Sequence, residues 1–236
     1  MAVIDWLDMR DPEFPPVESA LTDPDGLLAV GGNLFPERLI LAYQRGIFPW
    51  YEEGQPILWW APDPRSVIFP DQIRITRSLH KNLRNGGFMV TMDSSFEDVI
   101  TACAGKRNYS VGTWITRDMK EAYTELHRLE LAHSVEVWLD GNLVGGLYGV
   151  ALGQLFFGES MFSTVSNASK VALVHLAGQL QEWGYKLIDC QVQSEHMDSL
   201  GAQSIPRKSF QEYLGSYVQA PAKRGKWTIS WEYNPD

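Results

Sequence analysis

Hydrophobic and polar residues alternate most clearly along residues 135–162, VEVWLDGNLVGGLYGVALGQLFFGESMF. Two turn signals, Asp140-Gly141 and Gly153, divide this stretch. Alternation at a period of two on both sides of short glycine turns is typical of β-strands joined by hairpins. We therefore predict consecutive β-hairpins here.

A helical repeat follows these strands. Apolar residues recur at helical spacing from Ala168 to Leu180. Ser166 or Asn167 is placed to cap the start of this helix, and Gly184 is placed to end it. The chain thus moves from hairpins into one amphipathic helix.

An extended run, KLIDCQV, comes next, from Lys186 to Val192. Successive side chains of a strand point to opposite faces, so Leu187, Asp189 and Gln191 are predicted to share one face. This places a carboxylate beside an amide at the end of an otherwise apolar strand. The order of hairpins, helix and strand favours an α/β (α+β) fold with a mixed sheet.

Residues 1–63 differ from the rest because they are rich in Pro, Gly and Trp, and proline breaks their aromatic runs into short strands and turns. We predict a small N-terminal domain over residues 1–63 and a larger domain over residues 64–236. Residues 199–207 are predicted to be a turn segment. The further predicted helices are Pro36–Arg45, Arg74–Arg84, Ser94 or Ser95 to Ala104, one capped by Thr116, and one around Phe210–Tyr217.

Composition and charge narrow the function. A net charge of −9 argues against non-specific nucleic-acid binding through the whole surface, although it leaves room for a local basic patch and suits a basic peptide or amine substrate. Nine tryptophans indicate either a Trp-rich core or an aromatic cleft. Cys103 and Cys190 have no metal-finger spacing, and the chain has neither a secretory leader pattern nor a long apolar run. These features predict a soluble, cytoplasmic protein with reduced thiols and no membrane partner.

One segment, RITRSLHKNLR, is the densest basic feature of the chain. Helical spacing would put four basic residues on one face, where they are either simply solvated or contact nucleic-acid phosphates. These four residues are Arg74, Arg77, Lys81 and Arg84. Lys106 and Arg107, in a predicted loop, are candidates to join them.

Several familiar motifs are missing. The chain has no GxSxG nucleophile motif and no P-loop, and GGxxG at 145–149 favours close backbone packing or a bulge over a phosphate cradle. Two combinations of acidic and histidine residues lack metal-ligand spacing, so no metal is predicted. These are His133 with Glu136, and Glu159 with Asp189 and His196.

A set of long motifs resembles the leucyl/phenylalanyl-tRNA–protein transferase family in matching order over roughly Phe14 to Tyr217, while the last twenty or so residues match nothing in it. The motifs are FPP (14–16), DGLLAVGGNL (25–34), AYQRGIFPWY (42–51), ILWWAPDPR (57–65), GTWIT (112–116), AHSVEVW (132–138), LVGGLYGV (143–150), FGESMFS (157–163), NASK (167–170), KLIDCQ (186–191) and SLGAQSIPR (199–207).

The resemblance implies a specific reaction. Members transfer leucine or phenylalanine, and less readily methionine, from aminoacyl-tRNA to the α-amine of proteins with N-terminal Arg or Lys, which marks them for the bacterial N-end degradation route. It also implies a domain like the GCN5-related acetyltransferases behind a small N-terminal domain, no cofactor, and a monomer.

The resemblance also implies site residues at matching positions. The proposed catalytic pair falls on Asp189 and Gln191. Residues near the aminoacyl-adenosine and the tRNA 3′ end match Trp50, Trp114, Glu159, Tyr43 and Tyr123. The aminoacyl side-chain pocket matches Leu147, Phe156, Leu173, Leu176, Leu180 and Ile188. At Leu147, Leu176 and Leu180 the family can carry Met or Phe instead, so the preference between Leu and Phe stays open.

Elementary chemistry limits what Asp189 can do. An aminoacyl-tRNA ester is already activated, and an α-amine with a reference pKa of about 7.7–8.0 is partly neutral near pH 7. The enzyme mainly holds the two reactants together. Because aspartate is a weak base at its reference pKa of about 3.9, we favour a role for Asp189 in orienting Gln191 and stabilising the developing ammonium. Base catalysis by Asp189 is the alternative.

Two other functions compete. An acyl-CoA-dependent N-acetyltransferase would need a Gly-rich phosphate loop before the helix, but residues 162–170 read FSTVSNASK, without glycine. A non-catalytic tRNA-binding adaptor would need the aromatic cleft and the basic face, but not Asp189 beside Gln191.

Overall fold

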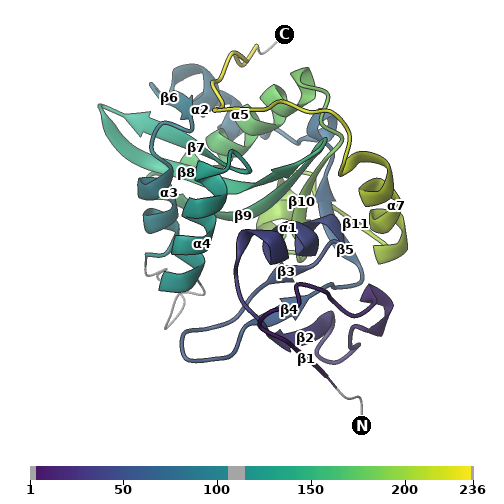
Figure 1. Cartoon of the computed structure of the whole chain (residues 1–236). Helices are drawn as coiled ribbons and strands as arrows, with labels where there is room; N and C mark the ends of the chain where they lie inside the picture. The colour runs from purple at the N-terminus through teal and green to yellow at the C-terminus, as the bar shows by residue number, and fades with distance from the viewer. Residues whose placement is uncertain (1–3, 106–114, 235–236) are drawn as a thin grey trace.

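The computed structural model describes residues 4–105 and 115–234, and within them the chain forms two β-sheets (Figure 1). The smaller sheet has the strand order β1-β2-β4-β3. Its strands are β1 (Asp5–Leu7), β2 (Leu27–Gly31), β3 (Phe48–Pro49) and β4 (Leu58–Trp60), and they are accompanied by a 3-10 turn (Val17–Ser19) and helix α1 (Pro36–Gln44).

The larger sheet has seven strands in the order β11-β5-β10-β9-β8-β7-β6. Neighbouring strands are antiparallel except β9 and β10, which run parallel because a helical crossover joins them. The strands are β5 (Arg65–Ile68), β6 (Met89–Met92), β7 (Ala132–Leu139), β8 (Asn142–Leu152), β9 (Leu155–Ser163), β10 (Leu187–Gln191) and β11 (Gln203–Ile205). The predicted α/β class, with a mixed sheet and a small N-terminal domain, is confirmed.

Helices cover both faces of the larger sheet. They are α2 (Arg77–Asn85), α3 (Phe96–Cys103), α4 (Arg117–Arg128), α5 (Ala168–Glu182), α6 (Glu195–Ser199) and α7 (Arg207–Tyr217), with a 3-10 turn at Pro70–Gln72. The small sheet and α1, together with α3 and α4, pack on one face, and α5 packs on the other (Figure 1).

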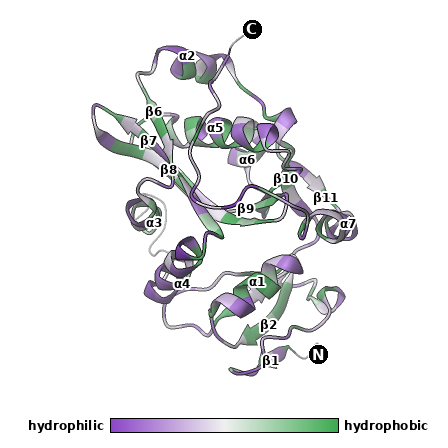
Figure 2. Cartoon of the chain, turned by 45° about the horizontal axis from the view of Figure 1, so that its top comes forward, coloured by the Kyte–Doolittle hydropathy of each residue, from purple (hydrophilic) through white to green (hydrophobic). Residues whose placement is uncertain are grey.

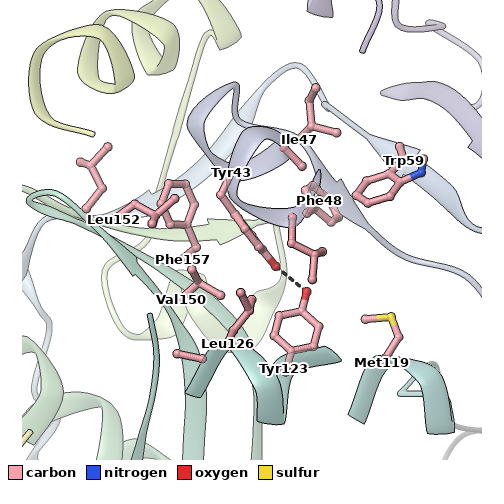
Figure 3. Packing of buried hydrophobic residues seen from close by; sticks show 14 of the residues in the cluster. Tyr43, Ile47, Phe48, Trp59, Met119, Tyr123, Leu126, Val150, Leu152 and Phe157 are labelled. Carbon is pink, nitrogen blue, oxygen red and sulfur yellow. Dashed lines mark hydrogen bonds between the residues drawn. The ribbon is translucent and has the colours of Figure 1, made fainter. Parts of the chain in front are cut away.

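Strand alternation creates two cores. On β9, Phe157 faces the core shared with α1, α3 and α4, whereas its neighbour Phe156 faces the core under α5. Figure 3 shows the first core, where Tyr43, Phe48 and Trp59 of the small sheet and α1 meet residues of α4, β8 and β9. The inner strands of the larger sheet, β5 and β7–β10, are therefore mostly buried on both sides.

Helices α3 and α4 lie where predicted. Helix α3 buries Phe96 and three further apolar residues, and α4 begins at its cap Thr116, whose Oγ1 accepts a hydrogen bond of 3.2 Å from the Met119 amide. The hairpin turns at Asp140-Gly141 and Gly153 are also confirmed. The three glycines at 145, 146 and 149 have no room for a side chain; a Cβ on Gly149 would lie 2.2 Å from the Phe157 carbonyl oxygen.

Three predictions need correction. Arg74 precedes α2, because Thr76 caps that helix and the Arg74 amide bonds to the Leu200 carbonyl instead. Residues 203–205 form strand β11 on the free edge of β5 rather than a turn. Asn167 is at the N-cap position of α5, but its backbone is left-handed and its side chain makes no capping hydrogen bond; the Ser163 hydroxyl accepts from the Ser169 amide instead.

The C-terminal segment, residues 218–234, follows no regular secondary structure but is firmly attached across α5 (Figures 1 and 2). Trp227 is fully buried, stacks on His133 with ring centroids 3.8 Å apart, and donates its amide to Asp93 at 2.7 Å. The Gln179 side-chain oxygen accepts from the amides of Ser230 and Trp231. Residues outside the family resemblance thus complete the core under α5.

Helix α7 makes contacts with residues of the N-terminal part of the chain. Phe210 and Leu214 pack against Gly46, which has a φ of 74° and no room for a side chain. The Arg207 guanidinium donates to the Ala61 carbonyl at 2.6 Å, and the Gln211 amide donates to the Arg45 carbonyl at 2.9 Å. The predicted division into residues 1–63 and 64–236 as separate domains stays a prediction.

Candidate active site

A cavity of about 990 Å³ opens where β9 and β10 part. The two strands pair from Leu155–Leu187 to Phe157–Asp189 and no further, although β9 continues to Ser163. Residues 158–164 line one side of the opening, and residues 188–190 and 192–194 line the other. Gln191 is not among the lining residues and reaches the site through its hydrogen bond to Glu159. The parallel pair thus separates within the sheet, and the gap connects its two faces.

One end of the cavity is apolar. Five of the six predicted side-chain pocket residues line it: Leu147, Phe156, Leu173, Leu176 and Ile188. Leu180 does not line it. That residue lies one turn further along α5 and is fully buried in the core.

The polar end of the cavity is centred on Glu159 of β9. Its Oε1 accepts hydrogen bonds from the Tyr43 hydroxyl at 2.8 Å and from Nε2 of Gln191 at 2.7 Å. Its Oε2 accepts from the Tyr123 hydroxyl at 2.9 Å, and the two tyrosine hydroxyls also contact each other (Figure 3). Elements far apart in the chain, α1, α4, β9 and β10, therefore meet at one carboxyl group.

Burial, helped by the nearby Asp189 charge, raises the pKa of Glu159 to about 7, even though the three hydrogen bonds from Tyr43, Tyr123 and Gln191 lower it. Burial, followed by the Glu159 charge, also raises the pKa of both tyrosines well above the ordinary value. Glu159 is therefore the group of this cluster that can change protonation near neutral pH.

Asp189 has a different environment. Its carboxylate is fully buried and binds Arg65 through two hydrogen bonds, Nε to Oδ1 at 2.8 Å and Nη2 to Oδ2 at 2.7 Å. Oδ1 also accepts the Gln191 amide at 2.9 Å. The Arg65 guanidinium lies between the rings of Phe48 and Phe210, 4.8 and 4.7 Å from their centroids. Every oxygen of Asp189 thus has a partner.

A β-bulge lies between Asp189 and Gln191. The pairing of β10 with β5 shifts register between Asp189 and Gln191, and Gln191 has a φ of 64°. A left-handed backbone is uncommon for a residue other than glycine and is found preferentially at functional sites. The bulge ends the strand at Gln191, short of Val192, and turns the amide side chain toward Glu159.

The residues predicted to bind the tRNA 3′ end differ in whether a ligand can reach them. Trp50 lines the cavity with 44% of its surface exposed, and its carbonyl accepts from the Trp60 indole at 2.7 Å. Trp114 lies outside the described residues. Tyr43 and Tyr123 are fully buried behind Glu159, so they support that residue and do not form a surface.

The basic residues predicted to contact phosphates are exposed. Arg77, Lys81 and Arg84 share one face of α2, the hydrophilic helix of Figure 2, and Arg74 is exposed just before it. Helix α2 packs against α5, and the Asn82 amide reaches the Ser166 carbonyl at 3.4 Å, close to the cavity residues Ser163 and Thr164. Lys106 and Arg107 lie outside the described residues.

Arg65 is absent from the predicted site residues, although it is the partner of Asp189. The available signal is weak: an arginine that begins an otherwise apolar strand, RSVIF, at residues 65–69. In the described parts of the chain, no three His, Cys, Asp or Glu side chains are arranged to hold a metal ion. None of the helices in those parts combines the length and apolar character needed to cross a membrane.

Comparisons with known proteins point to one family. The family model described as leucyl/phenylalanyl-tRNA protein transferase matches residues 67–215, and the model of its N-terminal domain matches residues 32–63. The leucyl/phenylalanyl-tRNA–protein transferase of Stutzerimonas stutzeri (strain A1501) is 56% identical over 93% of this chain and 97% of its own length. That of Azotobacter vinelandii (strain DJ / ATCC BAA-1303) is 59% identical over 89% of this chain and 92% of its own length.

Solved structures give a more distant likeness. A GCN5-related N-acetyltransferase from Kribbella flavida is 11% identical, with a TM-score of 0.38 over 72% of this chain and 60% of that one. The structure of L-PGS from Bacillus licheniformis is also 11% identical, with a TM-score of 0.40 over 82% of this chain and 64% of that one. These likenesses say nothing about activity.

Proposed function

This chain belongs to the leucyl/phenylalanyl-tRNA protein transferase family, a family of aminoacyltransferases, and from that premise we propose its reaction. It transfers leucine, phenylalanine and, less well, methionine from aminoacyl-tRNA to the α-amine of proteins that begin with Arg or Lys. The new peptide bond marks those proteins for degradation by the N-end rule. Because charged tRNA is a cytoplasmic substrate, we place this activity in the cytoplasm.

The observation that carries the proposal is the cavity, which joins an apolar end to a polar centre through the sheet. Leu147, Phe156 and Ile188 would surround the side chain of the transferred amino acid. An apolar pocket discriminates by only about 1–3 kcal/mol per methylene, which is consistent with several accepted amino acids. The ester would then lie at the strand break, next to Glu159 and Gln191.

The exposed Trp50 ring, with Trp114, would stack on the 3′ adenosine, since base–aromatic stacking contributes about 1–3 kcal/mol per base. The exposed basic face formed by Arg77, Lys81 and Arg84, with Arg74 beside it, would contact acceptor-stem phosphates. It adjoins the cavity through the contact of α2 with α5.

The residues at the polar centre would hold the two reactants together, which is the main requirement for an ester that is already activated. Glu159 lines the cavity, where the amine would attack, and Gln191 Nε2 donates to its Oε1 at 2.7 Å. Asp189 would fix Gln191 through its backbone amide, in line with the orienting role favoured from the sequence. The reaction proposed in this way requires no metal or organic cofactor.

The first test is transfer of radiolabel from Leu-tRNA to peptides that begin with Arg, Lys or Ala, with labelled acetyl-CoA run in parallel. We expect label on the Arg and Lys peptides alone. Label from acetyl-CoA would instead establish an N-acetyltransferase. Binding of Leu-tRNA without any labelled product, in a protein shown to be folded, would establish an adaptor.

A further inference from the structure

We propose that Glu159, and not Asp189, takes the proton from the attacking α-amine. The inference rests on the transferase reaction proposed above and assigns its proton acceptor. A general base must come within hydrogen-bonding distance of the proton that it removes and must have a free lone pair there. The two buried carboxyl groups of the site each accept three hydrogen bonds, but Asp189 accepts two of them from a cation and Glu159 accepts all of them from neutral groups.

Asp189 is committed to Arg65. Both of its oxygens accept from the guanidinium at 2.7–2.8 Å, and Oδ1 also accepts the Gln191 amide. To act as a base, Asp189 would have to leave a guanidinium that Phe48 and Phe210 hold in place.

Glu159 has only neutral donors. Its carboxyl group, Tyr43 and Tyr123 form a ring of three oxygen–oxygen contacts: each hydroxyl touches the carboxyl group, and the hydroxyls touch each other. Three contacts need three hydrogens, and two hydroxyls supply two. A protonated Glu159 supplies the third, so all three contacts can be hydrogen bonds when Glu159 holds a proton.

The charges around Glu159 agree with this assignment. Tyr43 faces it from α1, Tyr123 from α4 and Gln191 from β10, and all three are neutral. The charged residues nearby are Asp189 and its partner Arg65. Because burial brings the pKa of Glu159 to about 7, the ionised base and its protonated form are both populated at neutral pH, where a general base is most effective.

The step balances as follows. The amine nitrogen forms a bond to the ester carbonyl carbon while its proton passes to Glu159. The bond between that carbon and the ribose oxygen then breaks, and the oxygen leaves with a proton returned by Glu159. The products are an amide and a tRNA with a free hydroxyl, and Glu159 ends ionised as it began. Gln191 Nε2, bonded to Glu159 Oε1, keeps the carboxylate oriented.

The first measurement does not depend on activity. Difference infrared spectroscopy of the full-length protein between pH 5 and 9 should show a protonated carboxyl band that disappears with a midpoint near pH 7. The band should be missing in Glu159→Gln. Glu136→Gln is a matched control, because Glu136 is a fully buried carboxyl on the same sheet with hydroxyl donors from Thr91 and Ser134, and it does not line the cavity. This variant should keep the band.

The second measurement is the pH dependence of transfer from Leu-tRNA to an Arg peptide. Two groups, the amine and Glu159, must be deprotonated, so log(kcat/KM) should rise with a slope of two below about pH 6.5 in the wild type. In Glu159→Gln the slope should fall to one, and kcat should drop by about 10²-fold or more. Tyr123→Phe should keep the slope of two with its Glu159 midpoint raised, because a hydrogen bond that favours the charged form is lost.

Asp189→Asn separates the two candidates. If Glu159 is the base, this variant keeps a slope of two with a lower midpoint, because the charge that raises the pKa of Glu159 is gone. A slope of one in Asp189→Asn, with a slope of two in Glu159→Gln, would overturn the proposal in favour of Asp189. A wild-type protein that transfers no label would contradict the proposed function instead, while the infrared midpoint would still report on Glu159.

Discussion

The two buried carboxyl groups of the site, on neighbouring strands, have opposite kinds of partner. Asp189 meets a guanidinium and stays with it, whereas Glu159 meets two tyrosine hydroxyls and an amide. A buried ion pair is costly to break, because removal of one partner leaves the other charge without compensation. A buried acid among neutral donors can instead lose or gain its proton, as the proposed proton transfer requires.

The Arg65–Asp189 pair leads to a prediction about stability. Asp189→Ala should lower the free energy of unfolding by about 3–5 kcal/mol, because it leaves the Arg65 guanidinium buried without its counter-ion. Replacing both residues, as in Arg65→Met with Asp189→Leu, should recover most of that loss without restoring transfer. Urea unfolding at pH 7 measures both. Equal stability of Asp189→Ala and wild type would show that the pair contributes little.

Glu159 leads to a prediction about pH. Its pKa is about 7 in the folded protein against 4.5 as an ordinary value, so between these values the folded state binds more protons than the unfolded state. The contribution of Glu159 to stability is therefore complete below pH 4.5 and is lost as the pH rises through 7. The side chain of Glu159→Gln does not titrate. The free energy of unfolding of this variant, relative to that of the wild type, should therefore rise by about 3 kcal/mol between pH 4.5 and 8.

Chemical unfolding at several pH values, with Glu136→Gln as the control, measures this difference. A wild-type curve parallel to that of Glu159→Gln over the whole range would mean that Glu159 ionises at its ordinary pKa.

At the scale of elements, helix α5 lies between the cavity and the C-terminal segment. Its inner face supplies Leu173 and Leu176 to the cavity, and its outer face carries the C-terminal segment. Trp231 lies directly on Gly178, where a Cβ would come within 2.1 Å of the indole ring, and Gln179 accepts the Trp231 amide at 2.9 Å. A segment outside the matched family region thus fixes the helix that shapes the candidate pocket.

Two glycine substitutions test this attachment. Gly178→Ala should destabilise the protein by about 1–3 kcal/mol, because the added methyl displaces Trp231. Gly215→Ala, in α7 with open space around it, should instead stabilise by up to about 1 kcal/mol through helix propensity alone. Urea unfolding gives both values, and limited proteolysis should release the C-terminal segment faster in Gly178→Ala. Opposite signs support the attachment, and equal gains would contradict it.

At the scale of the whole molecule, charge is unevenly distributed along the chain. Residues 1–63 contain eleven acidic and three basic residues, so they carry −8 of the net −9. The remaining residues are nearly neutral and include the exposed face of α2. The total charge therefore does not oppose a local contact with tRNA, because fields from charges further away than about 10 Å are screened at ordinary salt.

A charge reversal tests that contact. Arg77→Glu with Lys81→Glu should raise the KM for Leu-tRNA and reduce the dependence of log K on log salt by about 1.4–1.8, the value for two lost phosphate contacts. Transfer at saturating tRNA should change little. The control is Arg128→Glu with Lys208→Glu, two exposed basic residues on α4 and α7. The same salt dependence in both double variants would mean that the α2 face is only solvated.

The small sheet also completes the site, which matters for the molecule as a whole. Tyr43 of α1 reaches Glu159, and Phe48 of β3 packs on the Arg65 guanidinium. Helix α7 adds Phe210 to the other side of Arg65. The centre proposed for catalysis is therefore supported by residues from both ends of the chain.

What the sequence by itself determined is local. Apolar periodicity located α3, α4, α5 and the hairpins, because burial of one helix face or one strand face repeats at a fixed spacing. It also placed Asp189 beside Gln191. It did not reveal the bulge at Gln191 that brings the two residues together. It also did not reveal that α2 begins after Thr76, because the basic residues keep helical spacing on both sides of this cap.

Tertiary structure alone decided the partners. Asp189 and Arg65 are 124 positions apart, and Glu159 and Tyr43 are 116 positions apart, so no spacing in the chain signals either pair. The cavity exists because β9 and β10 pair for three residues and then separate, with α5 packed over one face and the small sheet over the other. The ionisation of a carboxyl group depends on burial and neighbours in space, and these are settled only when distant segments pack together.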